Sequence, residues 1–269
     1  MRLFLLAALG FVAFAAFGGW AERLILYPFD PRQVAPVDAG LTGVNEQIVQ
    51  VNDEALVVWT TPAKSGKPTV LYFHGNAGNL ASRAGRFRRF MDRGYGIVAP
   101  AYRGSSGSSG SPNEEALILD ARRIYQTLRA GDLEVSLSGA LVAYGESLGT
   151  AVTIALADDP DTSLDGVILE APFASLQALA EHHYPSVATL VDTFESQWPS
   201  ETRAATALDM PLLVMHGTAD ELIPHAQGRA VYDAAPSTTK TMLSVKGAGH
   251  TDLWRSDTLP KLWRFIERQ

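Results

Sequence analysis

Hydrophobic residues fall into short runs along the chain, separated by longer amphipathic stretches. Runs of four or five apolar residues between turn-forming residues are typical of buried strands. They occupy residues 47–51, 56–60, 69–73, 96–99, 140–144, 166–169, 212–216 and 241–245. Helices are predicted at residues 80–93, 113–130, 147–158, 225–234 and 258–267. This alternation predicts an α/β fold with a mostly parallel sheet covered by helices on both faces, its first two strands being antiparallel.

Two segments do not follow this alternation of strands and helices. Residues 171–210 are inserted between two predicted strands and carry apolar side chains at helical spacing. That spacing fits either two amphipathic helices packed on the sheet edge or a helical lid that lines a pocket. Residues 104–111, Gly-Ser-Ser-Gly-Ser-Ser-Gly-Ser, look like a flexible linker and lack the Gly-Lys-Ser/Thr ending of a phosphate loop. We interpret them as a mobile loop at the mouth of a site.

The N-terminal segment is strongly apolar. Residues 3–20 contain no charged side chain, and about 18 residues of helix span roughly 27 Å, close to the hydrocarbon thickness of a bilayer. This predicts an uncleaved anchor over residues 1–26 and one domain over residues 27–269, placed outside the cytoplasm by the charge of Arg2 and the amino terminus. The alternative is a signal peptide cleaved near Ala16 or Gly18, which would release the domain.

Composition narrows the possible partners. A chain of 269 residues with 46% hydrophobic content can bury one large core, and its net charge of −7 argues against nucleic-acid binding. Zero cysteines exclude disulfides and a thiol nucleophile. The basic residues Arg83, Arg86, Arg88, Arg89 and Arg93 gather on one predicted helix. They form either a solvated helix face or a contact for anionic lipid headgroups.

The chemistry of the chain centres on residues 145–149, Gly-Glu-Ser-Leu-Gly. They follow a predicted strand and open a predicted helix, which places Ser147 on a sharp turn of the kind called a nucleophile elbow. A serine hydroxyl becomes a useful nucleophile only when a histidine takes its proton and a carboxylate orients that histidine. The sequence therefore has to supply both partners downstream.

Two loops that follow predicted strands supply them. His250 lies in a glycine-rich loop after the strand at 241–245, and Asp220 lies in the loop after the strand at 212–216. The order Ser, Asp, His is the one expected for a nucleophile elbow. Glu221 and Asp252 remain rivals for the acid, since a loop position can be misassigned by a residue.

The other histidines have simpler interpretations. His216 ends a strand and is expected to pack in the core, and His225 to lie at the surface. His182 and His183 are adjacent on a helix, so they do not share a face and a metal pair is not expected. We therefore expect no metal site and no cofactor.

The loop at residues 74–79, His-Gly-Asn-Ala-Gly-Asn, follows the strand at 69–73. In acyl transfer, backbone N–H groups must point at the oxygen that gains negative charge. The N–H groups of Asn76 and Leu148 are the predicted donors of this oxyanion hole. Because ligands bind at the carboxyl ends of parallel strands, the loop, the elbow and the two partner loops are expected to meet there.

These segments resemble a known family. Residues 73–79, 102–104 with Ser108, Gly110 and Pro112, 145–149, 217–224 and 249–254 are similar to α/β-hydrolase-fold serine hydrolases, in their membrane-anchored α/β-hydrolase-domain branch. That branch includes serine aminopeptidase-like proteins and protein depalmitoylases. The resemblance implies the α/β-hydrolase fold, with Ser147 as nucleophile, Asp220 as acid and His250 as base. Serines at 105 and 106 replace a bulkier Tyr-Gly pair of relatives, which leaves substrate preference open.

The expected function is hydrolysis of a carboxylic ester or thioester through an acyl-enzyme, without a cofactor. Lipid or acyl substrates are favoured because the apolar N-terminal segment would hold the domain at membrane lipid. A peptidase or amidase of the same fold is one alternative. A catalytically inactive binding protein on the same scaffold is another.

Overall fold

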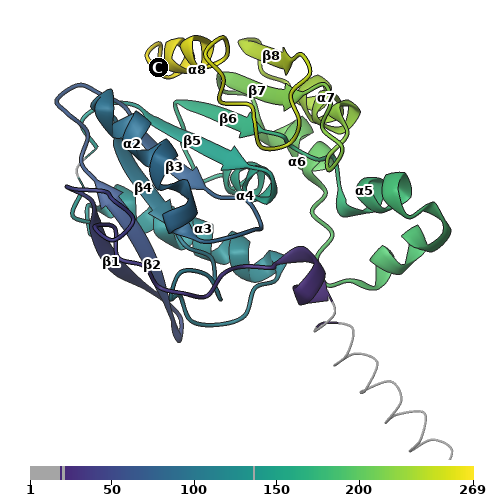
Figure 1. The fold of residues 1–269 in the computed structure, drawn as a ribbon, viewed down its shortest axis with the longest axis horizontal. Helices are drawn as coiled ribbons and strands as arrows, with labels where there is room; N and C mark the ends of the chain where they lie inside the picture. The colour runs from purple at the N-terminus through teal and green to yellow at the C-terminus, as the bar shows by residue number, and fades with distance from the viewer. Residues whose placement is uncertain (1–18, 20–21, 136) are drawn as a thin grey trace, which may run out of the picture.

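A computed structural model describes residues 19, 22–135 and 137–269. Its eight strands form one sheet in the order β1-β2-β4-β3-β5-β6-β7-β8 (Figure 1). The strands are β1 Asn45–Val51, β2 Glu54–Thr61, β3 Thr69–Phe73, β4 Gly96–Pro100, β5 Leu141–Glu146, β6 Gly166–Glu170, β7 Leu212–Gly217 and β8 Lys240–Val245. β1 and β2 pair antiparallel, β2 pairs antiparallel with β4, and the remaining pairs are parallel. The predicted sheet is therefore confirmed, including its antiparallel start.

Helices cover both faces of this sheet (Figure 1). They are α2 Ala84–Asp92, α3 Glu114–Ala130, α4 Leu148–Ala157, α5 Leu176–His183, α6 Ser200–Ala207, α7 His225–Ala234 and α8 Leu259–Ile266. Two 3-10 helices, η1 Leu80–Arg83 and η2 Pro185–Thr193, are also present, and residues 22–26 are helical. The helix predicted at 80–93 is thus divided, because Asn79 caps a short 3-10 turn through a reciprocal capping box with Ser82.

Two cores lie on opposite faces of the sheet. Along β2, Leu56 and Val58 pack into the core beneath α3, α4, α6 and α7, whereas Val57 and Trp59 pack into the core beneath α2 and α8. This alternation follows from the two-residue period of a strand. The central strands are buried along their whole length, as expected for parallel strands with a helix layer on each side.

The insert between β6 and β7 divides into two parts. Helix α6 contacts α4 and α7 and so belongs to a helix layer of the domain. Helices α5 and η2 contact each other and stand away from the sheet, beside the helical residues 22–26 (Figure 1). We call α5 and η2 the lid.

The glycine-serine loop at residues 104–111 corrects a prediction. Ser105, Ser106 and Ser108 are buried. The hydroxyl of Ser106 accepts the N–H of Leu80 at 3.0 Å, and the hydroxyl of Ser108 accepts the N–H of Val57 at 2.9 Å. The loop is a hydrogen-bonded structural connection and does not contribute to the pocket described below. Small hydroxyl side chains satisfy buried backbone donors here, a role that composition alone could not reveal.

The segment predicted as a membrane anchor lies outside the described residues, apart from residue 19. In the part of the chain that is described, no helix combines the length and apolarity needed to cross a bilayer. Residues 22–26 are helical and pack on the domain, with Glu22 buried and Leu26 half-buried.

Candidate active site

Ser147 occupies a strained turn between β5 and α4. Its backbone angles are φ 52° and ψ −115°, a conformation that L-residues rarely adopt. The flanking glycines are required by close backbone approach. A Cβ on Gly145 would lie 2.5 Å from the carbonyl oxygen of Gly149, and a Cβ on Gly149 would lie 2.0 Å from that of Phe73. The glycine-flanked serine predicted from sequence therefore has the geometry of a nucleophile elbow.

The structure brings Ser147, His250 and Asp220 together from three loops. His250 Nε2 lies 3.1 Å from Ser147 Oγ, and His250 Nδ1 lies 2.9 Å from Asp220 Oδ2. The rival acid Asp252 instead accepts the N–H of Gly249 at 2.6 Å and pairs with Arg255. The other rival, Glu221, is exposed. Among the three candidate carboxylates, Asp220 is the one that meets the imidazole.

Asp220 is held in its ionised form. Burial alone would raise the pKa of its carboxyl, but hydrogen bonding to His216 and His250 and the N–H of Ile223 outweighs burial and holds the pKa well below its usual range. Oδ1 accepts the N–H groups of Leu222 and Ile223, each at 2.9 Å. A permanently charged, doubly anchored carboxylate can orient the imidazole and stabilise its protonated form.

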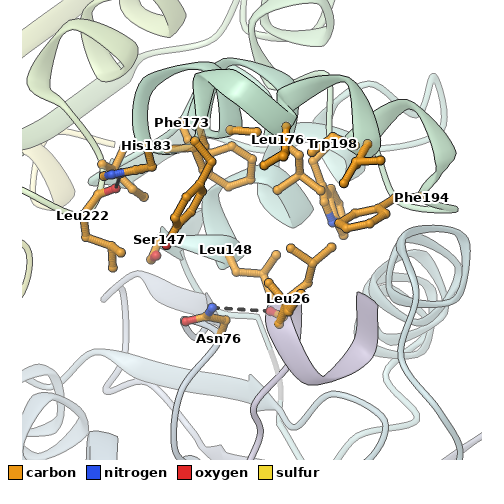
Figure 2. Close-up of a pocket in the computed structure, with 18 residues that line it drawn as sticks. Leu26, Asn76, Ser147, Leu148, Phe173, Leu176, His183, Phe194, Trp198 and Leu222 are labelled. Atoms are coloured by element: carbon orange, nitrogen blue, oxygen red, sulfur yellow. Dashed lines mark hydrogen bonds between the residues drawn. The ribbon is translucent and has the colours of Figure 1, made fainter. Parts of the chain in front are cut away.

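The two predicted oxyanion positions lie beside the serine. Asn76 and Leu148 line the same pocket as Ser147, with Leu148 beside the serine and Asn76 below it in the view of Figure 2. Leu148 is the first residue of α4, so its N–H has no acceptor one turn earlier in that helix. The Asn76 side chain is turned away to donate to the carbonyl of Leu26 at 3.3 Å, which fixes the loop that carries its backbone.

Two glutamates next to the nucleophile elbow, Glu146 and Glu170, are paired with arginines. Arg83 Nη2 lies 3.0 Å from Oε1 of Glu146, the residue that precedes Ser147, and Arg86 pairs with the fully buried Glu170. Burial would raise the pKa of Glu146, but Arg86 and Arg83 hold it below its ordinary value. Both predictions for the arginine cluster are therefore wrong for Arg83 and Arg86. Neither side chain faces solvent or is available to lipid, because each pairs with a glutamate at the end of one of two neighbouring strands.

The serine opens into an apolar cavity of about 410 Å³. Figure 2 shows Phe173, Leu176, Phe194 and Trp198 on one side of this pocket and Leu26 on the other, with Ser147 at its edge. The remaining lining residues are Ile25, Leu179, Ala180, His183, Tyr184, Val187, Leu190, Val191, Leu222 and Ile223, besides Asn76 and Leu148. The lid prediction is confirmed in that α5 and η2 supply much of the lining.

The helical residues 22–26 also form part of this pocket, which sequence reasoning missed. The buried carboxylate of Glu22 accepts the N–H groups of Glu195 at 2.8 Å and Ser196 at 3.0 Å, at the end of the lid. The Tyr27 hydroxyl bonds to the Ser196 hydroxyl at 2.7 Å and accepts the indole N–H of Trp198 at 3.0 Å. The one local signal in the sequence is a glutamate that follows the apolar segment 3–20.

His216 and His225 lie as predicted, whereas the place of His183 in the pocket lining was not predicted. His216 is fully buried and its Nε2 lies 2.8 Å from the carbonyl of Ile223, whereas His225 is half-exposed beside Ser244. His183 lines the pocket and bonds to the carbonyl of Leu222. Within the described ranges, no group of three or more His, Cys, Asp or Glu side chains could hold a metal ion.

The chain is similar to proteins from bacteria, yeast and human. It is 33% identical over 240 residues to the uncharacterized protein Rv2307c of Mycobacterium tuberculosis, covering 87% of this chain and 82% of that protein. It is 30% identical over 203 residues to the uncharacterized membrane protein YNL320W of Saccharomyces cerevisiae, covering 73% and 69%. It is 29% identical over 222 residues to human protein ABHD12B, covering 73% and 59%.

Solved structures share the fold at low sequence identity. The esterase Pf2001 of Pyrococcus furiosus superposes with a TM-score of 0.71 at 18% identity, over 89% of this chain and 97% of that one. A monoglyceride lipase variant from Saccharomyces cerevisiae superposes with a TM-score of 0.66 at 15% identity, over 90% and 97%. The family model for serine aminopeptidase S33, Hydrolase_4, matches residues 64–201 and 182–254. The chain therefore belongs to the serine aminopeptidase S33 family of α/β-hydrolases, in the branch that includes the α/β-hydrolase-domain proteins.

Proposed function

We propose that this protein is a serine hydrolase that cleaves carboxylic ester or thioester bonds of acyl or lipid substrates through an acyl-enzyme. The observation that carries the proposal is the hydrogen-bonded series Ser147, His250 and Asp220 at the edge of an apolar cavity of about 410 Å³. That volume lies within the range of small-molecule sites. Membership of a hydrolase family and the fold shared with an esterase and a lipase support it.

The geometry supports the following sequence of steps. His250 Nε2 takes the proton of the Ser147 hydroxyl while Oγ attacks the substrate carbonyl carbon. The carbonyl oxygen becomes negatively charged and is stabilised by the N–H groups of Asn76 and Leu148. Collapse breaks the bond to the leaving alcohol or thiol, which takes the proton from His250. Water then attacks the acyl-serine with His250 as base, releasing the carboxylic acid.

The apolar walls favour an acyl chain over a peptide. An aminopeptidase has to recognise a positively charged amino terminus, for which a carboxylate is the matching group. The described residues that line this pocket include no Asp or Glu. Burial of methylene groups against Phe173, Leu176 and the lid would instead favour an acyl chain, at about 0.8 kcal/mol per methylene.

The membrane association of the domain also belongs to this proposal. Residues 3–20 would hold the protein at a bilayer, and the similar yeast protein YNL320W is named a membrane protein. Cleavage of residues 1–18 as a signal peptide is the alternative, and it would leave Glu22 and the pocket wall in place.

The test is hydrolysis of p-nitrophenyl esters from acetate to palmitate by the full chain, with Ser147→Ala alongside. The wild type should favour longer chains and should be labelled by a fluorophosphonate probe. Ser147→Ala should lose both properties while its thermal unfolding midpoint stays nearly unchanged. Ser163→Ala, an exposed serine remote from the pocket lining, is the matched control and should behave as wild type. Persistent labelling of Ser147→Ala would rule out Ser147 as the nucleophile.

A further inference from the structure

Exposed hydrophobic side chains concentrate around the pocket. In the described part of the chain, nine large hydrophobic side chains are strongly exposed, and five of them line this one cavity. These five are Ile25, Tyr184, Val187, Leu190 and Leu222. Leu24, which is 57% exposed, precedes Ile25 in the same helical turn and is included with it. We call these six side chains the rim. Contiguous exposed apolar surface on a soluble domain marks an interaction site.

The charges beside the rim are mostly negative. Glu181, Asp192 and Glu221 belong to the same segments as the rim residues, and Arg23 is the basic residue next to Leu24. Binding to anionic lipid usually relies on several Lys or Arg side chains near the surface. A rim with this charge pattern suits a neutral surface, where burial of apolar area supplies the free energy.

The described chain enters the domain at the rim. Residues 22–26 follow the apolar segment 3–20 after a single residue, Ala21, and Leu24 and Ile25 in this helix belong to the rim. Glu22 fastens the same helix to the end of the lid through two N–H groups. Any membrane segment formed by residues 3–20 would therefore meet the bilayer beside the rim, within a few residues of the pocket.

We propose that the rim is a docking surface for the neutral, zwitterionic face of a lipid bilayer. Docking turns the pocket mouth toward the hydrocarbon, so an acyl chain passes from the bilayer into the cavity without crossing water. The benefit of this arrangement rests on the proposed acyl-directed activity, but docking itself is a binding event that can be measured without hydrolysis. The rim would supply a second membrane contact in addition to residues 3–20.

The absence of cysteine in the sequence permits a direct test. Leu24→Cys and Leu190→Cys in the full chain would each carry an environment-sensitive fluorophore, with the protein in phosphatidylcholine vesicles that contain spin-labelled acyl chains. Ile48→Cys and Leu119→Cys are matched controls, because both side chains are exposed and hydrophobic but lie outside the pocket lining. Quenching at positions 24 and 190 and not at 48 and 119 is the expected result.

Three outcomes would overturn the proposal. Equal quenching at all four positions, or none at 24 and 190, would mean that the rim does not face lipid. Quenching that requires phosphatidylserine would contradict a neutral surface. An apolar environment at position 24, which lies outside the pocket lining, before vesicles are added would show that a second copy, or another segment of this chain, covers the rim.

A second measurement connects docking to substrate delivery. Leu24→Glu should lower hydrolysis of a vesicle-embedded long-chain ester about tenfold or more and leave p-nitrophenyl acetate hydrolysis unchanged, because Leu24 is outside the pocket lining. Ile48→Glu should change neither rate. An unaffected vesicle rate in Leu24→Glu would contradict docking. Labelled Ser147→Ala should still be quenched at position 190, so failure of the catalytic proposal can be told apart from failure of docking.

Discussion

Arg83 joins the loop of the predicted oxyanion hole to the residue that precedes the nucleophile. Its Nη2 lies 3.0 Å from Glu146 Oε1, and its Nη1 donates to the carbonyl of Ala77 at 2.5 Å. Ala77 follows Asn76, whose N–H is a proposed oxyanion donor, and Glu146 precedes Ser147. One guanidinium therefore sets the spacing between the serine and a donor that has to meet the same carbonyl group. Arg83 is a positioning residue in this arrangement.

Replacing this guanidinium should slow catalysis more than it weakens binding. In Arg83→Met, the loop at residues 74–79 loses its link to Glu146, and a misplacement of about 1 Å can cost on the order of 100-fold in rate. We expect kcat for a p-nitrophenyl ester to fall about 10- to 100-fold with KM changed little. Steady-state kinetics measure both constants.

The control is Arg88→Met, since Arg88 lies on α2, the helix that follows Arg83, and donates to the carbonyl of Gly40 at the surface. It should retain wild-type kcat. A rise in KM together with the fall in kcat in Arg83→Met, with a lower unfolding midpoint, would indicate that Arg83 supports the fold and not the site.

The acid can be tested against its sequence rivals. Asp220→Asn preserves shape but removes the charge that faces His250 Nδ1, so kcat is expected to fall about 10³- to 10⁴-fold. Asp252→Asn and Glu221→Gln should stay within a few-fold of wild type, because neither side chain is bonded to His250 in the structure. A large loss in Asp252→Asn and none in Asp220→Asn would reverse the assignment of the acid.

Much of the fold was predictable because local patterns and tertiary structure agree. The apolar run at 69–73 becomes β3 with unchanged bounds, and the stretch at 225–234 becomes α7. Ser147, Asp220 and His250 could be predicted to lie together because each follows a strand, and the ends of parallel strands converge. The glycines at 145 and 149 predicted an elbow because a Cβ there would collide with backbone. In these places, short-range sequence determines the structure.

What the sequence did not reveal depends on long-range pairing. Glu22 lies 173 positions from Glu195, and no local pattern predicts that its carboxylate will be buried against that loop. Arg83 and Arg86 read as surface charges because their partners, Glu146 and Glu170, are distant in sequence. Residues 104–111 read as a linker because hydroxyl groups that satisfy buried N–H groups look the same as hydroxyl groups that face water.

His74 should make the fold sensitive to acid. It is fully buried, and burial together with Arg83 lowers the pKa of its imidazole to about 3. In the unfolded chain the imidazole is protonated below about pH 6.5, so the unfolded state binds one more proton in the window between about 6.5 and 3. The contribution of His74 to the free energy of unfolding is thus fully present above pH 6.5 and falls as the pH drops through that window.

The variant His74→Gln removes the titration and can still donate to the carbonyl of Gly75, whose oxygen accepts the Nδ1–H of His74 at 2.7 Å. Between pH 6.5 and 4.5 the free energy of unfolding of the wild type should fall by about 2 kcal/mol more than that of His74→Gln. Denaturant unfolding at the two pH values measures the difference. His182→Gln, at an exposed histidine, should keep the wild-type pH dependence, and parallel curves for wild type and His74→Gln would contradict the buried neutral imidazole.

Glu22 links the helical residues 22–26 to the end of the lid. Glu22→Ala would leave the N–H groups of Glu195 and Ser196 without their acceptor, and each unpaired buried donor costs about 1–3 kcal/mol. We expect the free energy of unfolding to fall by about 2–4 kcal/mol and proteolysis to become faster within residues 184–199. Glu181→Ala, at an exposed lid glutamate, is the matched control and should unfold as wild type.

Two truncated proteins test the contribution of residues 22–26 to the pocket. Removal of residues 1–18 keeps Glu22 and the pocket wall. Removal of residues 1–26 also takes Ile25 and Leu26 and should reduce long-chain ester hydrolysis. Equal stability and activity of the two truncated proteins would show that residues 22–26 contribute nothing to the site.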